Sequence, residues 1–370
     1  MPSLNHIIDT TLREGEQTPG VIFSPGEKTT ILDHLAAIGI DEAEIGISSP
    51  LVPSLDVLIR HCRENHPQLA LSLWCRCLRE DIDWAGRLQP DILSLSIPVS
   101  DLHLRERLGK DRDWARSRMT ASIADAVAAG LKVAVGFEDA TRAEPSFLRE
   151  MAILAERAGA CRLRLADTVG IGSPATIAGL VRDIALVTGD VDLGVHTHND
   201  FGMATANAVA ALEAGAVWAD ATVLGLGERA GCARLEELVG YIGLVGGDSG
   251  LYPDRLRPLA EFVAARAKLD PDPMRPVIGT AIFTCDTGLH LQGLQENPAT
   301  YEPYPPEAVG AERRLLFGAK CGRKALQQRL AGIGRSPDTE RLDQAIAVIR
   351  NRSRSLRAPL SDSELIATLS

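Results

Sequence analysis

A chain of 370 residues with 45% hydrophobic residues can hold one large barrel and a smaller module. Its formal charge of −10 comes from interspersed signs without basic runs, which argues against a nucleic-acid partner or an anionic membrane surface. No apolar run approaches the roughly 20 residues of a membrane span, and no cationic leader precedes an apolar stretch. We therefore expect a cytoplasmic protein.

Apolar, β-branched runs alternate with amphipathic helical patterns along most of the chain. We expect strands near residues 4–9, 42–47, 70–76, 92–98, 132–138, 161–167, 192–198 and 218–225. The helical patterns between them include Gly26 to Ile38, Arg118 to Ala129, Ser146 to Ala158 and Phe201 to Ala214. Eight such units in about 245 residues, without a Gly-x-Gly-x-x-Gly turn after the first strand, favour a closed (β/α)8 TIM barrel over an open doubly wound sheet.

The pattern changes after the eighth unit. We expect a catalytic barrel over residues 1–246 and a linker over 247–275 that contains one helix, Arg255 to Lys268. Residues 276–322 are rich in Gly, Pro and Tyr and are predicted to form a lid subdomain. The tail, residues 323–370, is predicted to be a helical C-terminal subdomain.

Two segments far apart in the sequence carry the chemistry. Arg13 and Glu14 follow the first strand, and His196 and His198 lie two residues apart, on one face of the seventh. Each segment also has a structural interpretation, as a helix cap with an ion pair or as a half-exposed strand. Together, two imidazoles and a carboxylate make a divalent-metal site with open positions, and the arginine can hold a bound carboxylate. The combination predicts a Lewis-acid enzyme acting on an oxo acid.

Further polar residues fall where the predicted strands end. They are Arg76, Ser96, Glu138, Asp139, Asp167, Thr168, Glu228 and Arg229. Barrel enzymes place their chemistry at the carboxyl ends of the strands, so the fold and the site support each other.

These motifs resemble the DRE-TIM metallolyase family of isopropylmalate, citramalate and homocitrate synthases, with hydroxymethylglutaryl-CoA lyase as a more distant relative. The resemblance rests on Asp9 to Gln17, His196 to Asp200, Gly225 to Gly231, and Gly288 to His290 with Asn297 to Glu302. The chain is most similar to the nitrogen-fixation type of homocitrate synthase, through Trp74 to Arg76, Leu95 to Asp101, Val133 to Arg142 and Ala166 to Gly170.

The resemblance implies a Claisen condensation of acetyl-CoA with a 2-oxo acid, and 2-oxoglutarate is the expected acceptor. Glu14, His196 and His198 would hold a divalent metal, Mg²⁺ or Mn²⁺ rather than Zn²⁺. Arg13 would stabilise the alkoxide and Thr168 would bind the C1 carboxylate. The acetyl-CoA loop would be formed by Gly225, Gly227, Glu228, Arg229 and Gly231, although a tight turn would also require its glycines.

The resemblance also implies a homodimer in which the partner's lid supplies a histidine and a tyrosine. These map onto His290 and Tyr301, and His290 would enolise acetyl-CoA. We further expect Glu138 among the catalytic residues and Gln17 and Ser96 among those that bind substrate. Arg76 would bind the distal carboxylate of 2-oxoglutarate, unless it pairs structurally with Glu44 or Asp101.

The chain departs from the family pattern in two places. Cys232 stands where relatives commonly have asparagine, so it either ligates the metal and favours Zn²⁺ or leaves that position to water. In the lid, two histidines of the family pattern are missing from residues 283–288 and 318–322. Alternatives are therefore another acceptor (pyruvate, 2-oxoisovalerate, oxaloacetate or a phosphonate oxo acid) or a non-catalytic paralogue.

Overall fold

The computed structural model describes residues 5–247, 249–286, 288–332, 335 and 338–367. The chain forms two compact units, Met1–Pro271 and Asp272–Ser370, called here the barrel unit and the C-terminal unit. No helix among the described residues is long and apolar enough to cross a membrane.

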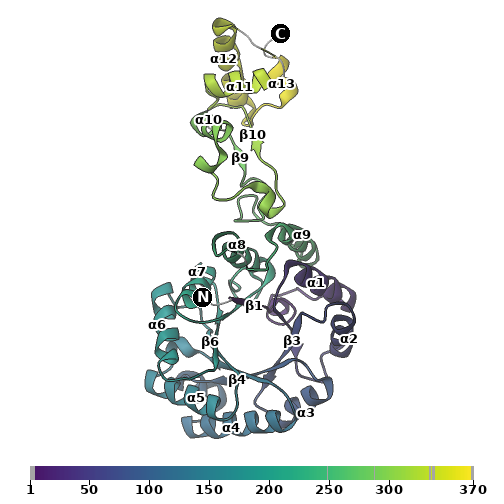
Figure 1. Ribbon diagram of the computed structural model, residues 1–370, viewed down its shortest axis with the longest axis vertical. Helices are drawn as coiled ribbons and strands as arrows, with labels where there is room; N and C mark the ends of the chain where they lie inside the picture. Colours follow the sequence, from purple (N-terminus) through teal and green to yellow (C-terminus); the bar gives the residue numbers. More distant parts are fainter. Residues whose placement is uncertain (1–4, 248, 287, 333–334, 336–337, 368–370) are drawn as a thin grey trace. The chain divides into compact units, whose positions relative to one another are not determined.

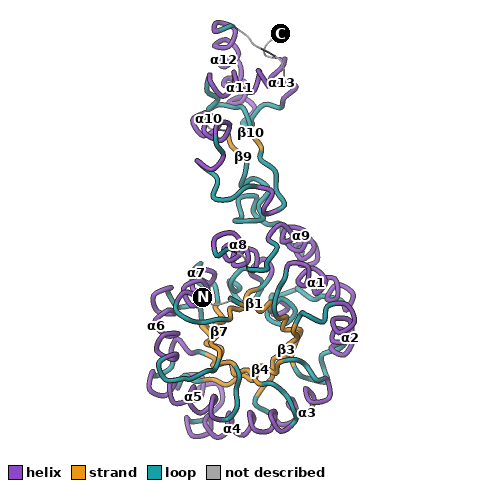
Figure 2. Tube along the Cα trace, viewed as in Figure 1, coloured by secondary structure: helices purple, strands orange, loops and turns teal. Residues whose placement is uncertain are grey.

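The barrel unit contains eight parallel strands that close into a ring, each pairing with the next and β8 with β1 (Figures 1 and 2). The strands are β1 His6–Asp9, β2 Glu42–Ile47, β3 Ala70–Arg76, β4 Ile92–Pro98, β5 Val133–Glu138, β6 Arg162–Asp167, β7 Asp192–Thr197 and β8 Trp218–Ala221. This closed ring confirms the predicted TIM barrel.

Helices surround the ring of strands (Figure 2). They are α1 Pro25–Ile38, α2 Leu55–Asn65, α3 Arg79–Leu88, α4 Arg112–Ala128, α5 Pro145–Arg157, α6 Pro174–Ala185, α7 Ala204–Glu213, α8 Leu235–Val245 and α9 Leu256–Ala267. Local sequence sets their ends. In α1, Ser24 and Glu27 form a capping box, Pro25 occupies the first turn, and Gly39 ends the helix with φ of 88°.

Two elements differ most from the sequence prediction. Helix α4 begins at Arg112 rather than Arg118, because the side chain of Asp111 caps it by accepting from the Trp114 N–H. Strand β8 ends at Ala221 rather than at residue 225, because the chain turns into a 3₁₀ segment, Val223–Gly225, in which Leu224 has φ of 61°.

The barrel interior contains charged side chains, whereas apolar side chains fill most TIM barrels. Glu42 and Glu44 of β2 and Arg162 and Arg164 of β6 are at most 5% exposed. They pair across the barrel, with Arg162 to Glu42 at 2.8 Å and Arg164 to Glu44 at 3.1 Å. Buried charged side chains are stable only when they are paired. The glutamates of β2 and the arginines of β6 therefore neutralise each other.

The C-terminal unit has a short two-stranded parallel sheet, four α-helices and two 3₁₀ segments, Pro298–Thr300 and Pro306–Val309, among its described residues. Its elements are β9 Thr284–Cys285, α10 Gly288–Glu296, β10 Arg314–Leu315, α11 Arg323–Gly332, α12 Thr339–Leu356 and α13 Asp362–Ala367. A small apolar core joins them, formed by Leu291, Phe317, Cys321, Ala325, Leu326, Leu330, Leu342, Ala345, Ile346, Ile349, Leu360 and Leu365. Cys321 is thus a packing residue.

Candidate active site

A pocket opens among residues at the carboxyl ends of the barrel strands. Nine of the predicted site residues line it: Arg13, Glu14, Gln17, Ser96, Glu138, Thr168, His196, His198 and Glu228. The remaining lining residues are Ile47, Trp74, Arg107, Gly136, Arg164 and Ala166. Most of the predicted barrel site therefore converges on one cavity.

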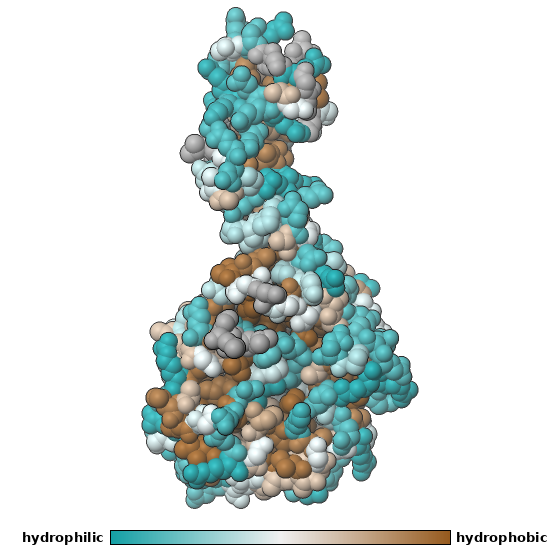
Figure 3. Space-filling view, in the orientation of Figure 1, coloured by the Kyte–Doolittle hydropathy of each residue, from teal (hydrophilic) through white to brown (hydrophobic). Residues whose placement is uncertain are grey.

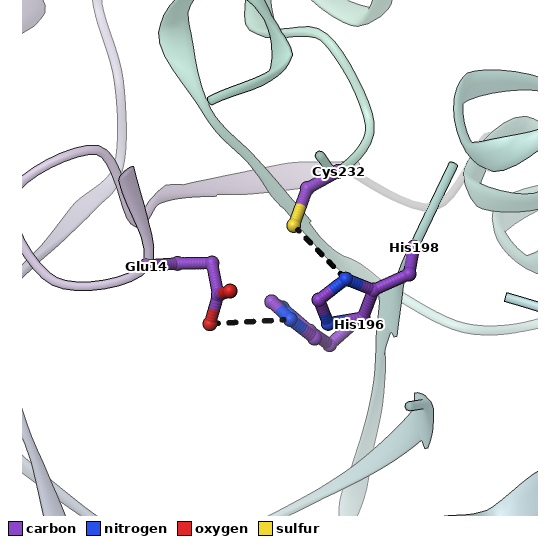
Figure 4. Close-up of side chains that lie close together, drawn as sticks. All are labelled: Glu14, His196, His198 and Cys232. Carbon is purple, nitrogen blue, oxygen red and sulfur yellow. Dashed lines mark hydrogen bonds and ion pairs between the residues drawn. The ribbon is translucent and has the colours of Figure 1, made fainter. Parts of the chain in front are cut away.

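The predicted metal ligands meet at this pocket and are joined by Cys232 (Figure 4). Glu14, His196, His198 and Cys232 are all buried, and their ligand atoms all lie within 4.8 Å of one another. The Nε2 atom of His196 is 3.9 Å from the Glu14 carboxylate. A carboxylate, two imidazoles and a thiol are donors suited to a divalent cation, so the residues present fit such an ion.

His196 is held in the orientation that a ligand requires. Its Nδ1 lies 2.8 Å from Oδ2 of Asp220, the buried aspartate of β8. This bond fixes the imidazole tautomer and leaves Nε2 available toward Glu14. Asp220 in turn accepts from Arg164 at 2.8 Å, which joins the site to the charged barrel interior.

The ionisation states also suit metal binding. Burial, together with the charge of His198, lowers the pKa of His196 well below its ordinary value, and burial lowers that of His198 as well. Burial raises the pKa of Glu14, but the charge of Arg13, those of the two histidines and the Glu228 N–H together outweigh it, and the pKa lies below the usual range. Near neutral pH the site thus offers an ionised carboxylate and two neutral imidazoles, the forms that bind cations.

Arg13 lies between two carboxylates. It pairs with Glu14 beside it and donates from Nε to Glu44 of β2 at 2.5 Å. Only 8% of the residue is exposed, so its charge acts in a dry environment. A fixed guanidinium beside the metal ligands can stabilise negative charge that develops on a bound oxygen.

Cys232 enters the site through the loop after β8. It forms an isolated antiparallel bridge with His198, and its Sγ lies 3.8 Å from Nδ1 of that histidine. Burial and the charge of Glu14 raise the pKa of the thiol well above its ordinary value. The thiol is therefore protonated in the metal-free protein. Ligation of the metal by Cys232 and a non-ligating thiol with water in its place both remain possible roles.

The glycines of this loop are required by the backbone itself. Gly225, Gly227 and Gly231 have positive φ values of 71°, 157° and 84°. A Cβ on Gly231 would lie 1.8 Å from the Gly225 carbonyl oxygen, and one on Gly227 would lie 2.9 Å from Cys232 Sγ. The loop also orients a metal ligand, because the Glu228 N–H donates to Glu14 at 3.5 Å. These glycines are explained without coenzyme A, whose binding there stays a prediction.

Arg229 and Thr168 belong to the same rim. Arg229 pairs with Asp200 at 2.9 Å and donates to the Thr168 carbonyl at 2.8 Å. The Thr168 hydroxyl accepts from the Asp139 N–H at 2.8 Å, so it keeps its own proton for another acceptor. That arrangement suits the binding of a carboxylate.

Glu138 is another charged residue of the pocket lining. This carboxylate accepts from the Ser96 hydroxyl at 2.7 Å and pairs with Arg107. Arg107 ends the π-helical segment η2, His103–Arg107, which follows β4, and its side chain is 49% exposed. Arg107 is thus a half-exposed cation of the pocket. It was not predicted from the sequence, although Arg105-Glu106-Arg107 follows the carboxyl end of a predicted strand.

The structure does not bring Arg76 to this pocket. It donates two hydrogen bonds to the buried Asp81 carboxylate, at 2.7 and 2.9 Å, and lies near Glu80. By strand alternation, Arg76 lies on the same inward-facing side of β3 as Trp74. It is the last residue of the strand, however, and its guanidinium turns to α3, where it neutralises Asp81. Neither predicted structural partner, Glu44 or Asp101, is among the pairs of Arg76 in the structure's described residues.

His290 and Tyr301 lie side by side in the C-terminal unit. Their ring centroids are 4.2 Å apart, His290 is exposed and Tyr301 is 45% exposed. Gly293 makes this contact possible, because a Cβ there would lie 2.4 Å from the Tyr301 ring. The two residues that the motifs single out in this unit therefore form one exposed pair.

Comparison with known proteins agrees with this geometry. The family model described as HMGL-like matches residues 5–263. The chain belongs to the HMGL-like family. A second model, described as homocitrate synthase post-HMGL domain-like, matches residues 277–355. Membership confirms the predicted family and the prediction that the chain is an enzyme.

Individual relatives of this HMGL-like protein span nearly its whole length. It is 42% identical over 328 residues to a homocitrate synthase of Frankia alni. The alignment covers 88% of this chain and 93% of the relative. It is 37% identical over 362 residues to 2-isopropylmalate synthase 2 of Caldanaerobacter subterraneus subsp. tengcongensis, covering 98% and 94%. The crystal structure of the HMG-CoA lyase from Brucella melitensis shares the fold, with a TM-score of 0.64, 20% identity and coverage of 71% and 99%.

Proposed function

We propose that this enzyme condenses acetyl-CoA with a 2-oxo acid and that 2-oxoglutarate is the acceptor, giving homocitryl-CoA, whose thioester is then hydrolysed by water to homocitrate and CoA. The observation that carries the proposal is the cluster of Glu14, His196 and His198 beside Arg13, in a pocket that also contains Arg107. The 42% identity to a homocitrate synthase supports the same acceptor.

Glu14, His196 and His198 would hold a divalent cation that polarises the ketone of the oxo acid as a Lewis acid. Arg13 stabilises the alkoxide that forms when the acetyl carbon attacks, because its charge is fixed in a buried position. The Thr168 hydroxyl donates to the C1 carboxylate. Glu138 positions Arg107 and Ser96 through the contacts that it accepts from both.

Arg107 is our candidate for the distal carboxylate of 2-oxoglutarate. It is the half-exposed cation of the pocket lining, whereas Arg13 and Arg164 are buried and already paired with two carboxylates each. Arg76 was predicted for this role from the sequence, but its bidentate pair with Asp81 holds it outside the pocket. Arg107 therefore takes over that assignment.

Enolisation of acetyl-CoA is assigned to His290 with Tyr301 beside it, contributed by a partner's lid in a homodimer. Removal of a proton from the acetyl methyl group requires a base on the open side of the pocket, and an exposed imidazole can serve. The loop from Gly225 to Gly231 would contact acetyl-CoA from the barrel side.

A second candidate acceptor is 2-oxoisovalerate, because Ile47 and Trp74 give the pocket an apolar wall at β2 and β3. Thiol release can be measured with acetyl-CoA, Mg²⁺ or Mn²⁺ and a panel of oxo acids. We expect 2-oxoglutarate to give the highest kcat/KM. Preference for 2-oxoisovalerate or pyruvate would overturn the dicarboxylate assignment, and absence of CoA release with every oxo acid would indicate a non-catalytic paralogue.

A further inference from the structure

A second group of metal-binding side chains lies on the outer helices of the barrel unit. Asp33 of α1, His61 of α2 and His66, the residue that ends α2, place their ligand atoms within 4.8 Å of one another. Nε2 of His61 and Nε2 of His66 lie 2.6 and 2.7 Å from the same oxygen, Oδ1 of Asp33. The two imidazoles thus meet at one carboxylate oxygen.

We propose that Asp33, His61 and His66 bind one Zn²⁺ ion at the surface of the barrel unit. Zinc–nitrogen and zinc–oxygen bonds are about 2.0–2.2 Å long, so ligand atoms of one ion are at most about 4.4 Å apart. The two imidazole nitrogens, now 2.6 and 2.7 Å from Oδ1 of Asp33, would move outward by roughly 1 Å to the spacing of tetrahedral ligands, with the ion replacing the hydrogen bonds between the three groups. Two imidazoles favour zinc over Mg²⁺ or Ca²⁺, which prefer oxygen ligands.

The surroundings allow an ion to enter. The side chains are 48%, 24% and 21% exposed for Asp33, His61 and His66, so water can fill the remaining coordination positions. The surface over α2, at the right of the barrel unit in Figure 3, is largely hydrophilic.

The site lies at the opposite end of the barrel from the pocket. His66 precedes the first residue of β3, Ala70, by one turn, and the Leu69 N–H donates to its carbonyl at 3.0 Å. It is therefore at the amino ends of the strands, the face that contributes to stability in TIM barrels. An ion there would tie α1 to the end of α2 and would stabilise the folded barrel without taking part in the reaction.

Zinc stoichiometry separates this site from the pocket. Metal-stripped protein would be titrated with Zn²⁺ against a chromogenic chelator, using wild type, H61N/H66N, H196A/H198A and the variant that combines all four substitutions. We expect wild type to take up two equivalents, each double variant one, and the combined variant none. Failure of H196A/H198A to bind Zn²⁺, or no loss of uptake in H61N/H66N, would overturn the proposal.

Two measurements keep the test independent of folding and of activity. His34 lies next to Asp33 on α1 and packs against Phe262, so H34N removes a neighbouring imidazole and should leave the stoichiometry unchanged. In the H196A/H198A background, Zn²⁺ at about 100 times its Kd should raise Tm by roughly 5 °C through linkage. That shift should vanish when H61N/H66N is added, and its persistence would assign zinc to other residues.

Discussion

The barrel unit and the C-terminal unit hold their chemical residues in opposite ways. In the barrel unit, Glu14 and His196 are at most 6% exposed and have fixed charged partners. In the C-terminal unit, His290 is exposed and its ring contact is with Tyr301, itself half-exposed. The barrel site is thus organised before any ligand arrives, whereas the role that we propose for the exposed pair requires a partner surface to cover it.

The largest expected effect tests the metal ligands of the barrel unit. Glu14→Ala or His196→Ala, or treatment with a chelator, should reduce CoA release roughly 1000-fold or more, because the Lewis acid contributes several kcal/mol to the transition state. The assay is thiol release, with circular dichroism to confirm that the barrel remains folded. Full activity in metal-stripped protein would contradict the metal assignment.

The next effect tests the exposed pair. His290→Ala should lower kcat roughly 100-fold, the scale expected for loss of a general acid or base, while the affinity for the oxo acid changes little. Tyr301→Phe keeps the ring beside His290 and serves as the comparison variant. Wild-type turnover in His290→Ala would remove the histidine from the mechanism.

Mixing two inactive variants shows whether the pair acts on a partner. Heterodimers of His290→Ala with His196→Ala would combine one intact barrel with one intact lid, if the lids are swapped. Random exchange makes half of the dimers mixed, and one of their two sites is intact, so about one quarter of wild-type activity should return. An active monomer at assay concentration, or no recovery after exchange, would contradict the swapped arrangement.

A smaller effect tests the acceptor pocket. Arg107→Ala should raise KM for 2-oxoglutarate at least about tenfold and spare that for acetyl-CoA, since a charge-assisted pair contributes roughly 1.5–3 kcal/mol. Arg76→Ala, whose guanidinium faces Asp81, is the matched control and should have little effect on either constant. The reverse result would return the role to Arg76.

The smallest effect concerns stability and pH. Burial lowers the pKa of His198 in the folded protein, while an unfolded histidine titrates near 6.5. Below about pH 6.5 the unfolded chain therefore binds more protons, and the free energy of unfolding falls as the pH falls. Between pH 8 and 5, Tm of the metal-free wild type should drop further than Tm of His198→Asn.

Asp9 acts in the opposite direction, because burial raises its pKa to about 7 despite two hydrogen bonds from Thr11. Acidification below that value therefore favours the folded state through this carboxyl group. Both proteins in the comparison retain Asp9, so its contribution cancels in the difference between their Tm values. Equal pH dependence of the two proteins would show that His198 is not a buried neutral group.

The sequence predicts the barrel well because eight strand-like segments that end in polar residues alternate with amphipathic helical patterns. It places Glu14, His196 and His198 together because the ends of parallel strands meet at one face. It cannot predict where a long side chain turns at a strand end, and Arg76 turns to Asp81. Arg107 was missed because its segment has neither strand nor helix periodicity, and Asp220 because a lone aspartate in an apolar strand has no visible partner until the barrel closes.

The charged network inside the barrel has a consequence for the time course of folding. Glu44 and Arg164 are 120 positions apart in sequence, and Arg164 and Asp220 are 56 apart. These contacts exist only once β2, β6 and β8 face one another, so we expect them to form late in folding, after long loops have closed. Interactions absent from the folding transition state mainly slow unfolding. We therefore expect the charges that prepare the site for chemistry also to lengthen the time for which a folded molecule persists before it opens.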